Sequence, residues 1–190
     1  MEKKIDEALA LGKELLGAAT NACRLVNGEG DHLPGLIVDR YKDVLVIQIA
    51  TLGMEKLKLF ILDLLIRKTS PRSIYERSNL PARHEEGLDD FEGGLYGENA
   101  EVVEIQEEDL RFRVAIRGSQ KTGFFLDLRE MRRLVRTLAR GRNVLNCFCY
   151  TGAFSVAAVA GGAARVTSVD SSEQALERAR ENFSLNGFPP

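Results

Sequence analysis

From Val144 to Ser155 the sequence reads Val-Leu-Asn-Cys-Phe-Cys-Tyr-Thr-Gly-Ala-Phe-Ser. This stretch predicts a short apolar strand, a tight loop with one glycine, and the first turn of a helix. A second β-branched run, Val166 to Val169, ends at the carboxylate of Asp170. A strand, turn and helix followed by a strand that ends in an acid form the first half of a doubly wound nucleotide-binding unit. In such a unit the N–H groups at the helix start face the ligand, and the acid accepts ribose hydroxyls.

The loop between the predicted strand and helix holds a single glycine, Gly152. A dinucleotide-binding loop needs three glycines, for the turn, the approach of the pyrophosphate and the packing of the helix. The loop therefore argues against NAD and FAD, and the absence of a Gly-Lys-Ser/Thr sequence excludes a P-loop. A compact adenosine ligand without phosphates, such as S-adenosylmethionine, fits better. The alternative from spacing alone is a generic strand-to-helix turn in an α/β protein that binds no ligand.

Three parts of the chain resemble a known family. Leu145–Ser155 looks like the first cofactor motif of S-adenosylmethionine-dependent RNA methyltransferases, and more narrowly of the bacterial large-subunit ribosomal RNA cytosine-5 methyltransferases. Gln120–Arg129 is similar to a second signature of that family, and segments between Asn27 and Tyr41 resemble its central domain. The resemblance extends from about Arg24 to Gly187.

The resemblance implies a set of cofactor-binding residues. Asp170 is the best single candidate, because an acid at the carboxyl end of a strand is well placed to accept both ribose hydroxyls. Lys121 and Asp127 are candidates for the methionine end, since a carboxylate binds an ammonium group and a lysine binds a carboxylate. Asp127 can also cap the helix that follows it, and the two roles are compatible. The other candidate contacts are Thr122, Phe125, Asn146, Phe148, Tyr150, Thr151, Gly152 and Ser171.

Length and composition are those of an ordinary globular protein, with 190 residues of which 44% are hydrophobic and 28% charged. No apolar run approaches the roughly 20 residues of a membrane span, so no membrane association is expected. Three cysteines, an odd number, indicate reduced thiols and a cytoplasmic protein. Cys147-Phe148-Cys149 lacks the spacing and the partners of a zinc site, so no metal is expected.

The net charge of −2 argues against a nucleic-acid binder, but the charges are unevenly distributed. Eleven acids and no basic residue lie between Glu85 and Asp109, whereas ten basic residues lie between Arg111 and Arg142. A helix from Asp127 to Arg140 would carry a basic face and, on its other side, an apolar stripe of Met131, Leu134, Val135 and Leu138. The basic face either follows RNA phosphates or is a solvated face partly paired with the acidic segment. Arg77 and Arg83 could likewise contact RNA phosphates, but a solvated surface position is preferred for both.

The predicted architecture is α/β. An α+β central domain that contacts RNA would span residues 1–125, and the N-terminal part of a Rossmann-like S-adenosylmethionine-binding domain would span 126–190. The first domain is expected to contain a helix from about Lys3 to Ala22, a hairpin over Leu36–Val38 and Val44–Ala50, and a helix from Met54 to Lys68. In the second, Ser171 is expected to cap a final helix that buries Leu176, Ala179 and Phe183.

No candidate catalytic residue follows Asp170. A cytosine-5 methyltransferase needs a cysteine thiolate and a polar loop that holds the base, which in the resembling family is of Asp-Pro-Pro type, and neither is present after that strand. The sequence is therefore expected to be an inactive part of a ribosomal RNA methyltransferase. Because parallel sheets are normally covered on both faces, we expect it either to dimerise through exposed strand edges or to be poorly ordered beyond about Gly161. The alternative function is a non-catalytic RNA- or protein-binding module that retains the fold.

Overall fold

The computed structural model describes residues 1–16, 19–98, 100–118 and 122–189. By its internal contacts the chain divides into two compact units. The first comprises Met1–Val103 and Val114–Phe124, and the second comprises Glu104–Arg113 and Phe125–Pro190. The sequence predicted a division near Phe125, which places all residues before it in the first domain. The structure instead assigns residues 104–113 to the second unit. Among the described residues, no helix has both the length and the apolar character needed to cross a membrane.

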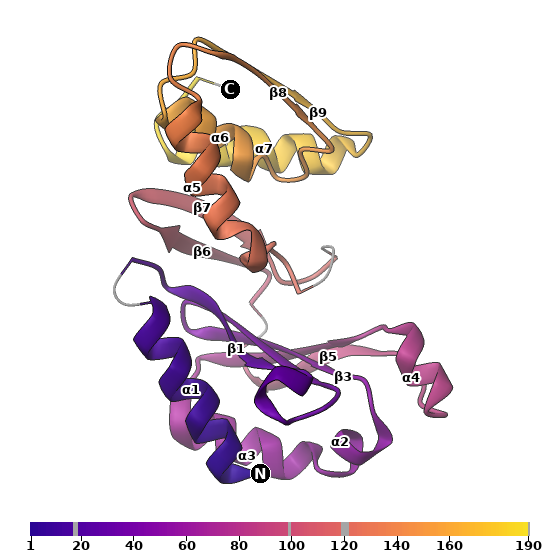
Figure 1. The fold of residues 1–190 in the computed structure, drawn as a ribbon. Helices are drawn as coiled ribbons and strands as arrows, with labels where there is room; N and C mark the ends of the chain where they lie inside the picture. Colours follow the sequence, from indigo (N-terminus) through magenta and orange to yellow (C-terminus); the bar gives the residue numbers. More distant parts are fainter. Residues whose placement is uncertain (17–18, 99, 119–121, 190) are drawn as a thin grey trace. The chain divides into compact units, whose positions relative to one another are not determined.

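The first unit is built on a five-stranded sheet with strand order β1-β2-β3-β4-β5 (Figure 1). Neighbouring strands are antiparallel except β3 and β4, which pair in parallel. The parallel pair requires a crossover, which the helices α2 and α3 supply. The strands are β1 (Ala22–Asn27), β2 (Leu36–Tyr41), β3 (Val44–Ile49), β4 (Ser73–Ser78) and β5 (Phe91–Gly97). The predicted hairpin is present as β2 and β3, and the Gly93-Gly94 pair lies within β5.

The helices of the first unit share one core with the sheet. Ile5 from α1 and Ile61, Leu64 and Leu65 from α3 are fully buried in the same apolar cluster as the inward side chains of β2 and β3. The helix predicted over 54–68 is interrupted at Leu57, where α2 ends and α3 begins. Figure 1 shows α1 and α3 on the same side of the sheet. The helical segments are α1 (Glu2–Leu16), the 3-10 turn η1 (Gly28–Asp31), α2 (Leu52–Lys56), α3 (Lys58–Thr69) and α4 (Pro81–Glu85).

Two arginines that the sequence placed at the surface are buried. The exposed fractions of Arg77 and Arg83 are 5% and 3%. The Arg83 guanidinium donates to the Ile49 carbonyl at 2.7 Å and to the Glu55 carboxylate at 2.9 Å. Arg77 pairs with Glu92 at 3.1 Å. The expectation of solvated or phosphate-contacting side chains is therefore wrong for both residues, because nearby carboxylates and carbonyls make their burial affordable.

The second unit contains a two-stranded parallel sheet and three helices. Strand β8 (Asn143–Cys147) pairs with β9 (Arg165–Val169), so that Asn146 lies opposite Ser168. Helix α6 (Ala153–Ala160) makes the crossover, as the sequence predicted, and α7 (Glu173–Leu185) follows β9. The unit also contains the 3-10 turn η2 (Leu126–Leu128), α5 (Arg129–Leu138) and residues 104–113, which form the outer part of the hairpin strands β6 (Val102–Glu107) and β7 (Leu110–Ala115).

Helix α5 exposes most of its apolar stripe and buries one arginine of its basic face. The apolar residues Met131, Leu134 and Leu138 are 50%, 47% and 55% exposed, whereas Arg132 is 2% exposed. Arg132 makes two hydrogen bonds, of 2.8 and 2.6 Å, to the carboxylate of Glu107 at the hairpin tip. The neighbouring acids of the tip pair with two further arginines: Glu108 with Arg133, and Asp109 with Arg136. The basic face is therefore largely neutralised by the acidic segment, in agreement with the second of the two readings of this helix.

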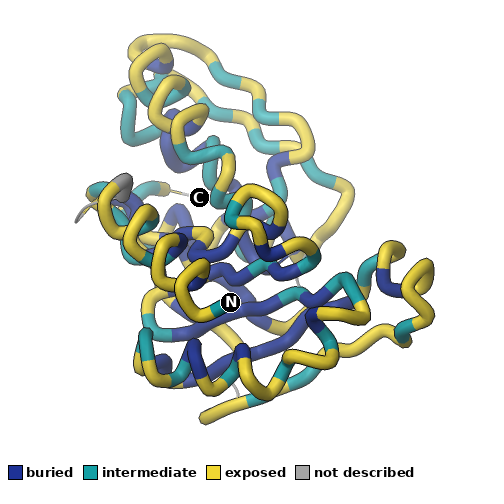
Figure 2. The backbone as a smooth tube through the Cα atoms, turned by 60° about the horizontal axis from the view of Figure 1, so that its bottom comes forward, coloured by how far each residue is buried: buried dark blue, intermediate teal, exposed yellow. Residues whose placement is uncertain are grey.

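The two-stranded sheet keeps one face open. Along β8 and β9 the residues alternate between half-buried and exposed, which Figure 2 shows as alternating teal and yellow. Leu145 and Val169 belong to the exposed set, at 64% and 49%. Parallel sheets are usually covered on both faces. Apolar side chains of this sheet thus remain in contact with solvent.

Candidate cofactor site

The loop from Phe148 to Gly152 has an uncommon backbone. Phe148, Tyr150 and Gly152 have positive φ angles of 57°, 48° and 76°. Positive φ is unusual for residues with a side chain and is concentrated at functional positions. At Gly152 a side chain is also excluded by packing, because an added Cβ would lie 2.8 Å from the Cβ of Ala179. The single glycine of the loop is thus required by both the turn and the approach of α7.

Hydrogen bonds join this loop to the end of the second strand. The Cys149 N–H donates to the Val169 carbonyl at 3.0 Å, and the Tyr150 N–H donates to Oδ2 of Asp170 at 2.8 Å. Oδ1 of Asp170 accepts the Ser172 N–H at 2.9 Å. The N–H groups of Ser172 and Tyr150 hold the pKa of the Asp170 carboxyl below its usual range. The glycine turn and the acid, which the sequence predicted to act together, are directly bonded.

The bonds to Asp170 leave it able to bind a further donor. An ionised carboxylate offers about four acceptor sites, and the backbone N–H groups of Tyr150 and Ser172 donate hydrogen bonds to this one. The side chain is only half-buried. The remaining acceptor capacity suits hydroxyl donors such as those of a ribose, so the residues at this end of the sheet fit an adenosyl group.

Beneath the loop, Asn146 belongs to a short polar chain. Its Nδ2 donates to the Ser155 hydroxyl at 2.9 Å, and Ser155 shares a 2.7 Å hydrogen bond with Ser168. This chain connects β8, α6 and β9. Thr151, next in the loop, is 4% exposed, and its hydroxyl has no hydrogen-bond partner among the described residues. Asn146 thus helps to hold together the elements on either side of the loop, whereas the buried Thr151 hydroxyl remains available as a hydrogen-bonding group.

Aromatic side chains flank the loop. The rings of Phe125 and Tyr150 meet edge to face, with 5.6 Å between centroids and an interplanar angle of 86°. Phe148 is 90% exposed.

Asp127 is exposed, and its side chain makes no hydrogen bond or ion pair with the described residues. Helix α5 has Leu128 at its N-cap position. The capping role weighed for Asp127 is therefore not used. Lys121 lies outside the described residues.

Thr122 belongs to a different network, inside the first unit. Its hydroxyl donates to Oδ2 of Asp39 at 2.5 Å and bonds with the Tyr41 hydroxyl at 2.9 Å. Arg24 completes the network with hydrogen bonds of 2.8 and 3.0 Å to Asp39. Burial, with the Asp39 charge beside it, raises the pKa of the Tyr41 hydroxyl. The Thr122 side chain therefore anchors its own segment to β2.

Helix α7 begins one residue later than predicted. The cap is Ser172, whose hydroxyl accepts the Ala175 N–H at 3.2 Å, and not Ser171. The prediction that Ser171 caps this helix is therefore wrong. Ser171 is exposed beside Asp170. Ser172 therefore has two contacts: its hydroxyl caps the helix, and its N–H donates to the Asp170 carboxylate.

The sequence missed one residue that contacts the loop. Asn182 on α7 is fully buried, and its Nδ2 donates to the Thr151 carbonyl at 2.9 Å. A signal existed, because position 182 follows Ala175 and Ala179 at helical spacing and so lies on the buried stripe. A polar residue at such a position needs a hydrogen-bond partner. Its partner comes from a distant segment, which the spacing within one helix does not identify.

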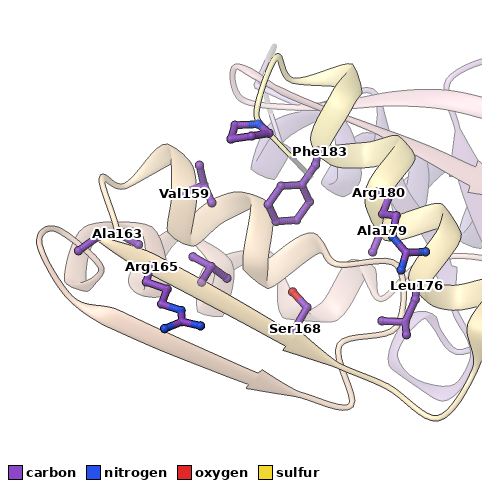
Figure 3. A pocket seen from close by; sticks show the side chains of 11 residues that line it. Val159, Ala163, Arg165, Ser168, Leu176, Ala179, Arg180 and Phe183 are labelled. Carbon is purple, nitrogen blue, oxygen red and sulfur yellow. The ribbon is translucent and has the colours of Figure 1, made fainter.

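A cavity of about 470 Å³ in the second unit does not coincide with this site. Figure 3 shows side chains from the end of α6, from β9 and from α7 around it, including Arg165, Ser168 and Arg180. None of the predicted cofactor residues lines it. Ala179 and Phe183 line this cavity and also border Gly152, so α7 separates the two regions.

Curated relatives of this chain are ribosomal RNA methyltransferases by name. It is 43% identical over 188 residues to the ribosomal RNA large subunit methyltransferase I of Tolumonas auensis, with 97% of this chain and 47% of that protein covered. The protein of the same name from Aeromonas hydrophila is 46% identical over 167 residues, covering 87% of this chain and 42% of the relative. The chain thus spans about half the length of the curated relatives it matches.

Similar solved structures are also methyltransferases by title. An S-adenosylmethionine-dependent methyltransferase from Streptococcus mutans has a TM-score of 0.86 and 29% identity, covering 98% of this chain and 48% of its own. A methyltransferase crystallised with S-adenosylhomocysteine has the same values. The sequence model for S-adenosylmethionine-dependent methyltransferases matches residues 24–189. The chain, whose α/β fold is of the Rossmann-like class, belongs to the S-adenosylmethionine-dependent methyltransferase family.

Proposed function

We propose that this chain binds S-adenosylmethionine at the carboxyl end of β8 and β9. The observation that carries the proposal is the hydrogen bond between the Tyr150 N–H and Asp170 Oδ2, which brings the glycine turn and the acid together at 2.8 Å. Asp170 accepts the ribose hydroxyls in this arrangement. The Tyr150–Gly152 backbone, with its positive φ angles, forms the adjoining wall of the adenosyl pocket.

The remaining candidate residues take supporting roles in the proposal. Phe125, whose ring packs on Tyr150, and the exposed Phe148 supply apolar contact for the cofactor. The exposed Asp127 carboxylate suits the ammonium group of the methionine part, with Lys121 as the matching cation. When bound, the cofactor supplies an activated methyl group on a sulfonium. The chain's own residues hold and orient it.

We propose that the methyl acceptor is a base of ribosomal RNA, and that this base is a cytosine methylated at C5. Support comes from the names of the curated relatives, which act on large-subunit ribosomal RNA. The proposed division of labour is an RNA-contacting central domain over 1–125, apart from residues 104–113 of the second unit, and a cofactor-binding part over 126–190. No catalytic nucleophile is assigned, and the 190 residues alone are proposed to be inactive in transfer. A cytoplasmic location accords with a ribosomal substrate.

The exposed face and edges of the β8–β9 pair also support self-association. Leu145 and Val169 present apolar surface, and each strand has an unpaired edge within the second unit. We propose a homodimer formed through these edges. Size-exclusion chromatography with light scattering tests it: a mass near 42 kDa, twice the 21.1 kDa of one chain, is expected, and a stable monomer at high concentration contradicts it.

The cofactor proposal is tested by calorimetry with S-adenosylmethionine and S-adenosylhomocysteine. The wild-type chain is expected to bind both, and Asp170→Ala is expected to weaken binding about tenfold or more, as the loss of charge-assisted hydrogen bonds of ~1.5–3 kcal/mol requires. Ser184→Ala, an exposed position late in α7, is the matched control. Unchanged affinity in Asp170→Ala contradicts the assigned role. Wild-type protein that binds RNA but neither cofactor form favours the non-catalytic module.

A further inference from the structure

Asn182 joins the cofactor loop to a strand of the hairpin. The residue is fully buried on α7. Its side-chain Nδ2 donates to the Thr151 carbonyl at 2.9 Å, and its Oδ1 accepts the Arg113 N–H of β7 at 2.8 Å. One amide therefore satisfies a backbone acceptor in the loop and a backbone donor in the strand. Buried polar groups require such pairing.

A second asparagine, one helical turn later, makes a comparable link without reaching the loop. Oδ1 of Asn186 accepts the Arg111 N–H at 2.9 Å, and its Nδ2 donates to the Arg111 carbonyl at 2.7 Å. The same Nδ2 donates to the Asn182 carbonyl at 2.7 Å. Asn182 and Asn186 thus both fasten α7 to β7. Only Asn182 continues to the cofactor loop.

The atom that Asn182 holds decides the orientation of one peptide plane. The Thr151 carbonyl and the Gly152 N–H belong to the same planar peptide unit, so fixing one fixes the other. That N–H donates to the Cys149 carbonyl at 2.9 Å, and the Gly152 carbonyl accepts the first hydrogen bond of α6, from Val156 at 2.9 Å. Rotation of this plane would disturb the turn on both sides. The constraint from Asn182 comes from outside the β8–β9 pair.

We infer that Asn182 is a positioning residue of the cofactor site: it orients the Thr151–Gly152 peptide so that the loop presents its binding geometry. The inference rests on the proposed function, because it assigns a role within the same site. In the proposed site Asn182 does not touch the cofactor. It acts through the Thr151 carbonyl, and its loss leaves that buried carbonyl and the Arg113 N–H without their partner.

The test compares Asn182→Ala with Asn186→Ala in the 190-residue chain. Both variants remove amide hydrogen bonds to β7 and are expected to lower the melting temperature. Only Asn182→Ala is expected to weaken S-adenosylhomocysteine binding, by about tenfold, with Asn186→Ala within twofold of wild type. Equal affinities for the two variants, both near wild type, overturn the inference. If wild-type protein itself does not bind, the proposed function fails instead, and the two failures are distinguishable.

A spectroscopic readout separates positioning from general destabilisation. In ¹⁵N-labelled protein at low temperature, the amide resonances of Tyr150 and Gly152 are expected to shift in Asn182→Ala and to stay in place in Asn186→Ala. Asn182→Ser, which is smaller and keeps a hydroxyl, replaces the alanine variant if that variant does not fold. Resonances of the loop that are unchanged in either Asn182 variant overturn the inference independently of the binding data.

Discussion

Substitution of Gly152 by alanine isolates the two reasons for the single glycine of the cofactor loop. The φ angle of 76° costs a residue with a side chain about 1–2 kcal/mol. The added Cβ would lie 2.8 Å from the Cβ of Ala179, which overpacks a buried contact at a further cost of about 1–3 kcal/mol. The expected loss in the free energy of unfolding is therefore ~2–5 kcal/mol.

Gly141→Ala is the matched control. Gly141 lies in the same unit with a φ angle of 69°, but an added Cβ there meets nothing within 4 Å. This variant carries only the backbone cost of about 1–2 kcal/mol. The difference between the two variants in urea denaturation, followed by circular dichroism, measures the contact with α7.

A double-mutant cycle assigns that difference to one neighbour. Ala179→Gly removes the Cβ that Gly152→Ala would meet, so the double variant is expected to recover about 1–3 kcal/mol relative to the sum of the single variants. Affinity for S-adenosylhomocysteine should follow the same order, because the strained turn is part of the proposed pocket. If Gly152→Ala is no more destabilising than Gly141→Ala, the close approach of α7 to the loop is refuted.

Three further outcomes are expected. Arg132→Met removes both short hydrogen bonds from the buried Glu107 carboxylate, which keeps only the Arg129 guanidinium at 3.5 Å, and should cost about 3–5 kcal/mol in urea denaturation, with recovery when Glu107 is also replaced by leucine. Because the pKa of Asp170 is lowered in the folded state, its contribution to stability is present above the unfolded value of about 3.9 and is lost as the pH falls through the folded value; Asp170→Asn should flatten this acid limb of a thermal pH series. Burial and the Asp170 charge raise the pKa of the Cys149 thiol, so iodoacetamide at pH 8 should label the exposed Cys147 first, as peptide mass spectrometry would detect.

The parts of the fold that the sequence predicted well depend on local patterns. The strand, turn and helix around Gly152 are consecutive in the sequence, within residues 143–160, and the acid that follows β9 comes at a spacing set by one crossover helix. The apolar, β-branched runs on either side of residues 39–43 likewise identified the β2–β3 hairpin. Each of these features is specified by neighbouring residues, so a single sequence suffices.

The features that the sequence missed depend on contacts between distant segments. Arg132 occupies a buried position because Glu107, on another element, neutralises it. Arg83 is buried for a similar reason, with Glu55 as its partner. Asn182 acquires its role from Thr151 and Arg113, and nothing within α7 names either partner. Charged and amide side chains were assigned to solvent by type, whereas the fold decides their burial by supplying partners.

The outer part of the β6–β7 hairpin, residues 104–113, is packed into the second unit although Val114–Phe124 returns to the first. The second unit is therefore discontinuous in sequence, and a piece cut at Phe125 would lose the carboxylate that matches Arg132 and the strand held by Asn182 and Asn186. During synthesis, residues 104–113 leave the ribosome well before α7 and must wait for it. The second unit can therefore be completed only after α7 has been synthesised, when residues 104–113 find their partners.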